Sequence, residues 1–179
     1  MYPECPTILR TVTVGGLTQS QLVDALRTNA IALNESAERL LASAQFTTSP
    51  TPYSVPTVEL TVGDLDFPRG ATSAEFYARA GELGLGLGPL ELGPHLRLQY
   101  RDQPEGAWGQ PVRRHQAPSG SITIASATLA DDDDFPNGFY VRRIAGVLWL
   151  RGYRSWPQHV WEADDRFIFV THPDEGALT

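Results

Sequence analysis

The stretch Phe167-Ile168-Phe169-Val170 is apolar at every position, and so is Val147-Leu148-Trp149-Leu150. A strand with one wet face alternates apolar and polar residues, so runs without polar positions are typical of strands covered on both faces. Ala145-Gly146, just before the second run, predicts a hairpin turn. We therefore expect a mostly antiparallel sheet of roughly four strands over residues 121–171. Its other two strands are expected at Ile122 to Leu129 and Phe139 to Ile144.

The amino-terminal half contains two similar segments. Thr13-Val14-Gly15-Gly16-Leu17 matches Thr61-Val62-Gly63-Asp64-Leu65, and each segment follows a β-rich run. Each also precedes a capping-box pattern, Thr18 with Gln21 and Thr72 with Glu75, which predicts the start of a helix. We interpret residues 8–100 as a duplicated strand–helix unit that packs on the sheet. The alternative is two independent strand–helix units with similar turn residues.

The fold class expected from these elements is α+β, in a single domain over residues 1–179. Asn34 to Ala44 has apolar residues at helical spacing and predicts a second helix after the first unit. Leu96 to Tyr100 alternates apolar and polar residues, which predicts a strand. Residues 101–120 are rich in Gly and Pro and predict a loop or linker.

Composition limits the classes of function. The formal net charge is −7, and this disfavours nucleic acid as a partner, although a local basic patch would permit it. The single cysteine, Cys5, allows no intramolecular disulfide and suits a reducing cytosol. No apolar run is long enough to span a membrane, and the amino terminus lacks a signal-peptide pattern. We expect a cytoplasmic protein whose partner is another protein and which does not bind membranes. The oligomeric state stays open.

The strongest candidate binding surface combines arginines with aromatic residues near the carboxy terminus. Such residues form cation–π contacts and anchor interfaces, although tryptophans also fill cores. Trp149 lies in an apolar run and should be buried. If the region is a binding surface, at least one of the two later tryptophans, Trp156 or Trp161, should be exposed beside Arg151 or Arg154. The predicted binding residues are Arg142, Arg143, Arg151, Tyr153, Arg154, Trp156 and Trp161.

Motifs for cofactor or metal chemistry are weak. The chain has no lysine and so no phosphate-binding GxxxxGK element, and we expect no cofactor. The run Asp131 to Asp134 does not fit a calcium loop, and we interpret it as a solvated acidic loop. The four histidines lack metal-ligand spacing: His95, His115, His159 and His172.

Catalysis is the second hypothesis. His159 is a candidate general base near Asp164 or Asp165, in a small hydrolase-like enzyme whose site only the fold assembles. The sequence leaves open whether the chain is an enzyme. A non-catalytic binding or interaction module is the function that we expect.

Three stretches together resemble an uncharacterised family of bacterial and phage proteins. They are Gly15 to Thr18, Glu82 to Pro104, and Trp161 with Asp164 to Phe169. The resemblance covers nearly the whole chain and implies no activity, cofactor or catalytic residue. Gly88 stands where relatives are expected to have a cysteine, which argues against a thiol-dependent role.

Overall fold

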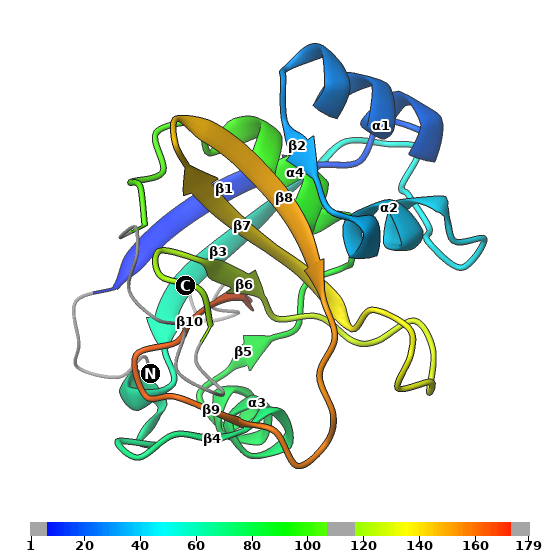
Figure 1. Cartoon of the computed structure of the whole chain (residues 1–179). Helices are drawn as coiled ribbons and strands as arrows, with labels where there is room; N and C mark the ends of the chain where they lie inside the picture. Colours follow the sequence, from blue (N-terminus) through cyan, green and yellow to red (C-terminus); the bar gives the residue numbers. More distant parts are fainter. Residues whose placement is uncertain (1–6, 107–116, 173–179) are drawn as a thin grey trace, which may run out of the picture.

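The computed structural model describes residues 7–106 and 117–172, and Cys5 and His115 lie outside them. Eight strands form one mixed sheet, in the order β1-β3-β10-β6-β7-β8-β2, with β5 paired to β10. A separate pair, β4 and β9, lies beside α3 (Figure 1). The strands are β1 (Ile8–Val14), β2 (Ala32–Leu33), β3 (Tyr53–Thr61), β4 (Ala71–Thr72), β5 (Leu85–Gly86), β6 (Ile122–Ile124), β7 (Gly138–Ile144), β8 (Val147–Tyr153), β9 (Val160–Trp161) and β10 (Arg166–Thr171).

The class α+β is right, but the expected sheet of roughly four mostly antiparallel strands is wrong. The sheet is larger, mixed and curled like half a barrel (Figure 1). β10 pairs with β6 in parallel and with β3 antiparallel, while β2 runs parallel to β8. The difference lies in β1 and β3, because both strands are members of the sheet and do not belong to separate units packed on it.

Four α-helices and one short 3₁₀ helix accompany the sheet in the described residues: α1 (Gln19–Thr28), α2 (Glu35–Ala42), η1 (Gly63–Leu65), α3 (Ser73–Glu82) and α4 (Leu92–Gln99). The sheet curls so that β1 and β8, far apart in its strand order, both contact α4. Helix α2 packs on β8, and α1 contacts both α2 and α4. The helices α1, α2 and α4 therefore cover one face of the curled sheet.

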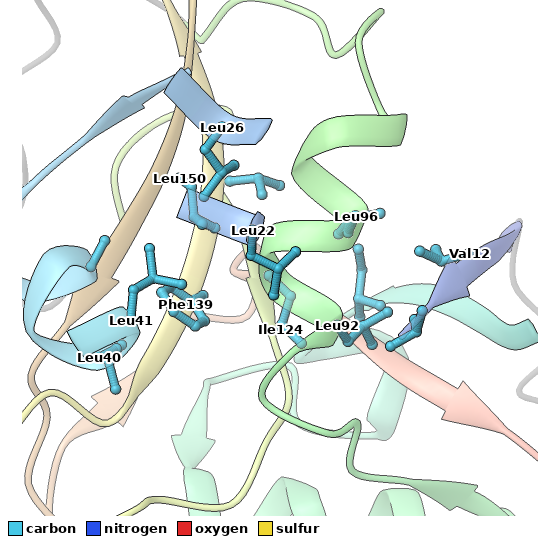
Figure 2. Close-up of a cluster of buried hydrophobic side chains, with 14 of the residues drawn as sticks. Val12, Leu22, Leu26, Leu40, Leu41, Leu92, Leu96, Ile124, Phe139 and Leu150 are labelled. Carbon is cyan, nitrogen blue, oxygen red and sulfur yellow. The ribbon is translucent and has the colours of Figure 1, made fainter. Parts of the chain in front are cut away.

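Two hydrophobic clusters form the core, one on each face of the sheet. The first surrounds α4 and includes Leu22 of α1, Leu96 of α4 and Leu150 of β8 (Figure 2). The second surrounds α3 and includes Phe76 of α3 and Phe167 of β10. Because side chains alternate along a strand, β10 contributes to both clusters. This confirms that its continuous apolar run is covered on both faces.

Local signals located the helix starts and one turn. The side chains of Thr18 and Thr72 cap α1 and α3 in complete capping boxes, as predicted. The predicted hairpin turn joins β7 to β8, with Ala145 at φ 51° and Gly146 at φ 76°. Positive φ at both central residues is typical of the hairpin turn whose twist matches that of the strands.

The strand predicted at Leu96 to Tyr100 is wrong, because these residues belong to the end of α4. Leu92 and Leu96 are four residues apart and both buried, as expected for one face of a helix. Pro94 falls in the first helical turn, where its missing N–H breaks no intrahelical bond. Arg97 is also buried, so the alternation did not reflect one wet face.

The structure does not support the duplicated unit. In both halves a ten-residue helix is followed by a short strand and an eight-residue helix. However, β2 pairs in parallel with β8, whereas β5 pairs antiparallel with β10. The helices α2 and α4 both contact β7 and β8, but only α4 also packs on β1. The two halves therefore share an order of elements but differ in strand pairing and in the strands that their second helix contacts.

Candidate functional site

A pocket of about 330 Å³ opens beside β6, β7 and β8, on the face of the sheet that carries the second core cluster. Three aromatic residues line it, Tyr140, Tyr153 and Trp161, together with His159 and Arg154. We call it the aromatic pocket. Two hydroxyl side chains of the β6 region complete the polar part of the wall, Ser121 and Thr123.

Strand register brings the aromatic and cationic side chains to this face. Phe139 and Val141 are buried in the first cluster, so Tyr140 between them points to the opposite face. Arg151 lies directly opposite Tyr140, and Trp149 lies opposite Arg142. The guanidinium of Arg151 is 5.1 Å from the centre of the Trp149 ring and 5.9 Å from that of Tyr140. These distances are those of cation–π contacts.

Trp161 is fixed in place at one end of the pocket. Its Nε1 donates a hydrogen bond to Oγ of Ser73 over 2.9 Å. Its ring meets the rings of Tyr153 and Phe167 edge to face, at centroid distances of 5.6 and 5.0 Å. Only 6% of the residue is exposed. Such contacts add to the stabilisation from burial, so the ring is held in place on several sides.

The phenols around Trp161 stay neutral at physiological pH. Burial raises the pKa of Tyr153 to about 12, although a hydrogen bond with Tyr77 opposes the shift. Burial also raises the pKa of Tyr140, and the nearby positive charge of Arg151 opposes it. Raised pKa values keep both hydroxyls protonated, so they can donate hydrogen bonds but do not serve as bases near neutrality.

The structure brings some of the predicted binding residues together and separates others. Tyr153, Arg154 and Trp161 line the aromatic pocket, and Arg142 and Arg151 lie on the same face of β7 and β8. Arg142 Nε donates to the carbonyl of Ser119 over 3.0 Å. Arg143 belongs to the opposite face, because it alternates with Arg142 along β7.

The tryptophans differ in exposure. Trp156 is 50% exposed, two residues after Arg154, whereas Trp161 is buried and Trp149 is half-buried. One exposed tryptophan is what a binding surface requires, although Trp149 is less buried than expected. Trp156 lines a different pocket from Trp161. The binding role of the predicted residues stays a prediction.

Of the two carboxylates proposed as partners for His159, Asp164 and Asp165, the second is held by backbone hydrogen bonds. Asp165 is buried, and its two oxygens accept hydrogen bonds from the backbone N–H groups of Ala117 and Glu162, over 3.1 and 2.9 Å. Burial raises its pKa to about 6 despite these two bonds. His159 lies between two tryptophan rings, 5.0 Å from that of Trp156 and 4.8 Å from that of Trp161. These ring contacts position His159 in the loop before β9, and its role as a general base stays a prediction.

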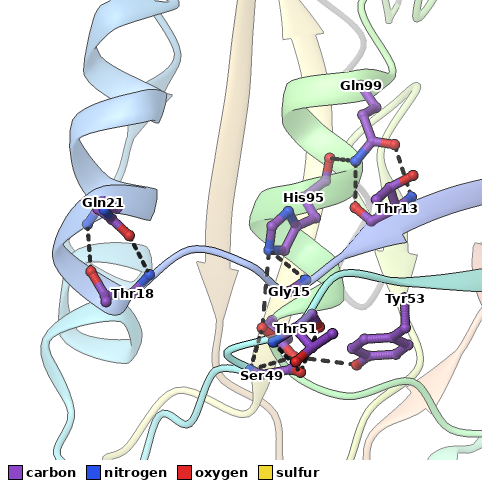
Figure 3. Close-up of polar contacts among 10 residues, drawn as sticks. Thr13, Gly15, Thr18, Gln21, Ser49, Thr51, Tyr53, His95 and Gln99 are labelled. Atoms are coloured by element: carbon purple, nitrogen blue, oxygen red, sulfur yellow. Dashed lines mark hydrogen bonds and ion pairs between the residues drawn. The ribbon is translucent and has the colours of Figure 1, made fainter.

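Sequence reasoning missed a buried polar cluster where α4 meets the turn between β1 and α1 (Figure 3). His95 Nε2 accepts a hydrogen bond from the backbone N–H of Gly15 over 3.1 Å, and burial lowers the pKa of this histidine. Glu91, one helical turn earlier, accepts hydrogen bonds from the N–H of Ser49 and the hydroxyl of Tyr53. The spacing of Glu91 and His95 was the only sequence signal. The hydrogen bonds of this cluster connect α4 to the β1–α1 turn and to the loop between α2 and β3.

The acidic run Asp131–Asp134 is exposed in the loop between β6 and β7, as predicted. In the described part of the chain, no group of three or more His, Cys, Asp or Glu side chains is placed to hold a metal ion. No helix in the same residues has both the length and the apolar character needed to cross a membrane.

No protein-family model, curated protein or solved structure matches this chain. The resemblance seen in the sequence therefore has no matching family model, and it carries no function. Any assignment of function to this chain rests on the geometry of the site.

Proposed function

We propose that this protein is a non-catalytic binding module that holds a partner protein at the aromatic pocket. The observation that carries this proposal is the pocket itself, with three aromatic residues in its wall and Arg154 beside them. Tyrosine, tryptophan and arginine are the residues most enriched among those that dominate binding energy at interfaces. Rigid aromatic walls also lose little conformational entropy when a ligand enters.

The size of the pocket favours a large side chain as the group that enters it. A volume of about 330 Å³ is near the lower end of the range of roughly 300–1,000 Å³ found for small-molecule sites. Arg154 lines the pocket, and Arg142 and Arg151 lie on the same face of β7 and β8, whereas the chain as a whole has a net charge of −7. The local charge therefore favours a partner segment that carries an aromatic residue and an acidic one.

A displayed library of random peptides, selected against the purified protein, tests the proposal. Selected peptides should be rich in aromatic and acidic residues, and their affinity can be measured by fluorescence anisotropy. Arg154→Ala should weaken binding by about 2 kcal/mol, the usual scale for an interface residue that dominates affinity. Tyr140→Phe, which removes only a hydroxyl, should weaken it less.

Arg27→Ala is the matched control, because Arg27 is an exposed arginine on α1 and does not line the pocket. It should leave the affinity unchanged. Peptides that bind all three variants as tightly as the wild type would show that the aromatic pocket is not the binding site. Circular dichroism of each variant establishes that the fold is intact.

A further inference from the structure

A second pocket lies on the other side of Tyr153, which lines both cavities. Its volume is about 190 Å³, and it lies between the β6–β7 loop and the segment that follows β8. Three successive carboxylates line it, Asp131 to Asp133, together with the half-exposed ring of Trp156. We call it the acidic pocket.

The charged residues that line this pocket are all acidic. Among the residues that the structure describes, none with a basic side chain lines it. An ion pair at the end of the loop joins Arg154 to Asp134 over 3.5 Å, and neither residue belongs to the wall. The described carboxylates do not converge as metal ligands do. Carboxylates beside an exposed indole ring are instead suited to an organic cation, which gains both charge attraction and a cation–π contact.

Two buried hydroxyl groups of residues in the wall have no hydrogen-bond partner among the described residues. Ser126 is 5% exposed, and its Oγ has no hydrogen-bond partner within the described residues. Ser155 is half-buried, and its Oγ also has no hydrogen-bond partner within the described residues. Both residues line the acidic pocket. Buried hydroxyls in native proteins are normally hydrogen-bonded, so two such groups in one pocket suit a ligand that brings N–H donors.

We infer that the acidic pocket binds one guanidinium or primary ammonium group, as carried by an arginine or lysine side chain of a peptide. A volume of about 190 Å³ is below the range of roughly 300–1,000 Å³ for sites of whole small molecules. It is enough for the end of one long side chain. Free polyamines share the same chemistry and are the other source of such a group. Binding of a cation here does not depend on what the aromatic pocket holds.

The test is a titration followed by NMR of the tryptophan indole and serine amide signals. The probes are Nα-acetyl-arginine amide, Nα-acetyl-lysine amide and putrescine, with Nα-acetyl-citrulline amide as a neutral analogue of arginine. The cationic probes should shift the signals of Trp156 and Ser126 in a saturable manner that weakens with salt. The citrulline probe should not, because it has the shape of arginine without its charge.

A variant that combines Asp131→Asn, Asp132→Asn and Asp133→Asn should bind the cationic probes at least about tenfold more weakly, because the attraction between opposite charges is removed. The three side chains are exposed, so the fold should persist. Asp24→Asn, an exposed carboxylate on α1, is the matched control and should bind as the wild type does. Tyr140→Phe should also bind normally, because Tyr140 lines only the aromatic pocket.

Equal binding by the wild type and the triple variant would overturn the inference, as would equal binding of arginine and citrulline probes or no saturable shift with any cation. Tighter binding of putrescine than of both amino-acid amides would support the cation site and identify free amines as its source. Loss of peptide binding in Arg154→Ala, with normal peptide binding in the triple variant that loses the cationic probes, separates the two proposals.

Discussion

Gly15 shows how one residue can join two elements at close range. Its φ is 85°, a value that other residues adopt only with strain, and its N–H donates to His95 of α4 (Figure 3). A Cβ atom at this position would lie 2.5 Å from the carbonyl oxygen of Thr51. Gly146, in the β7–β8 turn, has a similar φ of 76°, but a Cβ atom there would have no heavy atom within 4 Å. A side chain would therefore meet backbone strain at both glycines, but steric crowding only at Gly15.

We expect Gly15→Ala to destabilise the protein by about 3 kcal/mol or more, and Gly146→Ala by about 1 kcal/mol. The smaller figure is the cost of a left-handed conformation with a Cβ, and the larger adds the displacement of packed backbone. Chemical denaturation of both variants measures the difference. Equal losses would mean that the loop around Thr51 moves away at little cost.

At the same scale, three residues of the aromatic pocket were among those singled out in the sequence, Tyr153, Arg154 and Trp161, but the rest of its wall was not. Tyr140 lies inside an apolar run, so only its position opposite Arg151 shows that it faces the pocket. The positions of Ser121 and Ser126 likewise depend on strand pairing. Which side chains converge is set by contacts between distant segments, and no local pattern encodes them.

At the scale of the element, helix ends set by side chains a few residues apart could be predicted from the sequence. A helix stabilised by contacts with distant segments could not. The caps of α1 and α3 use residues three positions apart, so their pattern is visible in the sequence. The helix α4 has a poor local signal, with Gly93 and Pro94 in its first turn. Burial of Leu92 and Leu96 against the sheet stabilises it, and tertiary contacts outweigh propensity there.

The two capping boxes provide a matched experiment, because one uses Gln21 and the other Glu75. The pKa of Glu75 is lowered by hydrogen bonds from the backbone and side chain of Thr72. A carboxyl group with a lowered folded pKa stabilises the fold above its unfolded pKa, and that stability is lost as the pH falls through the folded value. Glu75→Gln should therefore lower the thermal midpoint at neutral pH, and Gln21→Glu should raise it, since negative charge favours a helix amino terminus.

Both effects should disappear in acid below the folded pKa of the glutamate, where Glu and Gln are both uncharged. Thermal unfolding followed by circular dichroism at the two pH values measures this. The wild type at each pH is the reference. A Glu75→Gln effect that persists unchanged in acid would show that the difference arises from packing of the side chain and not from its charge.

At the scale of the whole molecule, the strand order is the part that the sequence could not provide. β10 lies between β3 and β6, which precede it in the chain by more than a hundred and by about forty residues respectively. Its apolar run predicted that other elements cover both faces of β10, but such a run is compatible with any pair of neighbouring strands. Pairing partners are selected by the complete packing of both faces, and the mixed, curled sheet follows from that selection.

The same strands connect the two core clusters, so the protein should unfold in one transition. Val55 of β3 belongs to the first cluster and Val58 to the second, while Ile168 and Phe167 divide β10 in the same way. Loss of either cluster uncovers one face of both strands. Leu96→Ala in the first cluster and Leu65→Ala in the second should each cost about 2–5 kcal/mol, the usual range for a buried leucine.

Each of these two variants should move the midpoint of the same urea transition, followed in parallel by tryptophan fluorescence and by far-ultraviolet circular dichroism. The slope of the transition should not change, because the area exposed on unfolding is the same. Two separate transitions, with each variant moving only one of them, would mean that the faces of the sheet unfold independently. A shared transition follows if β3 and β10 lose the support of both clusters together, since a strand buried on two faces has no stable half-covered state.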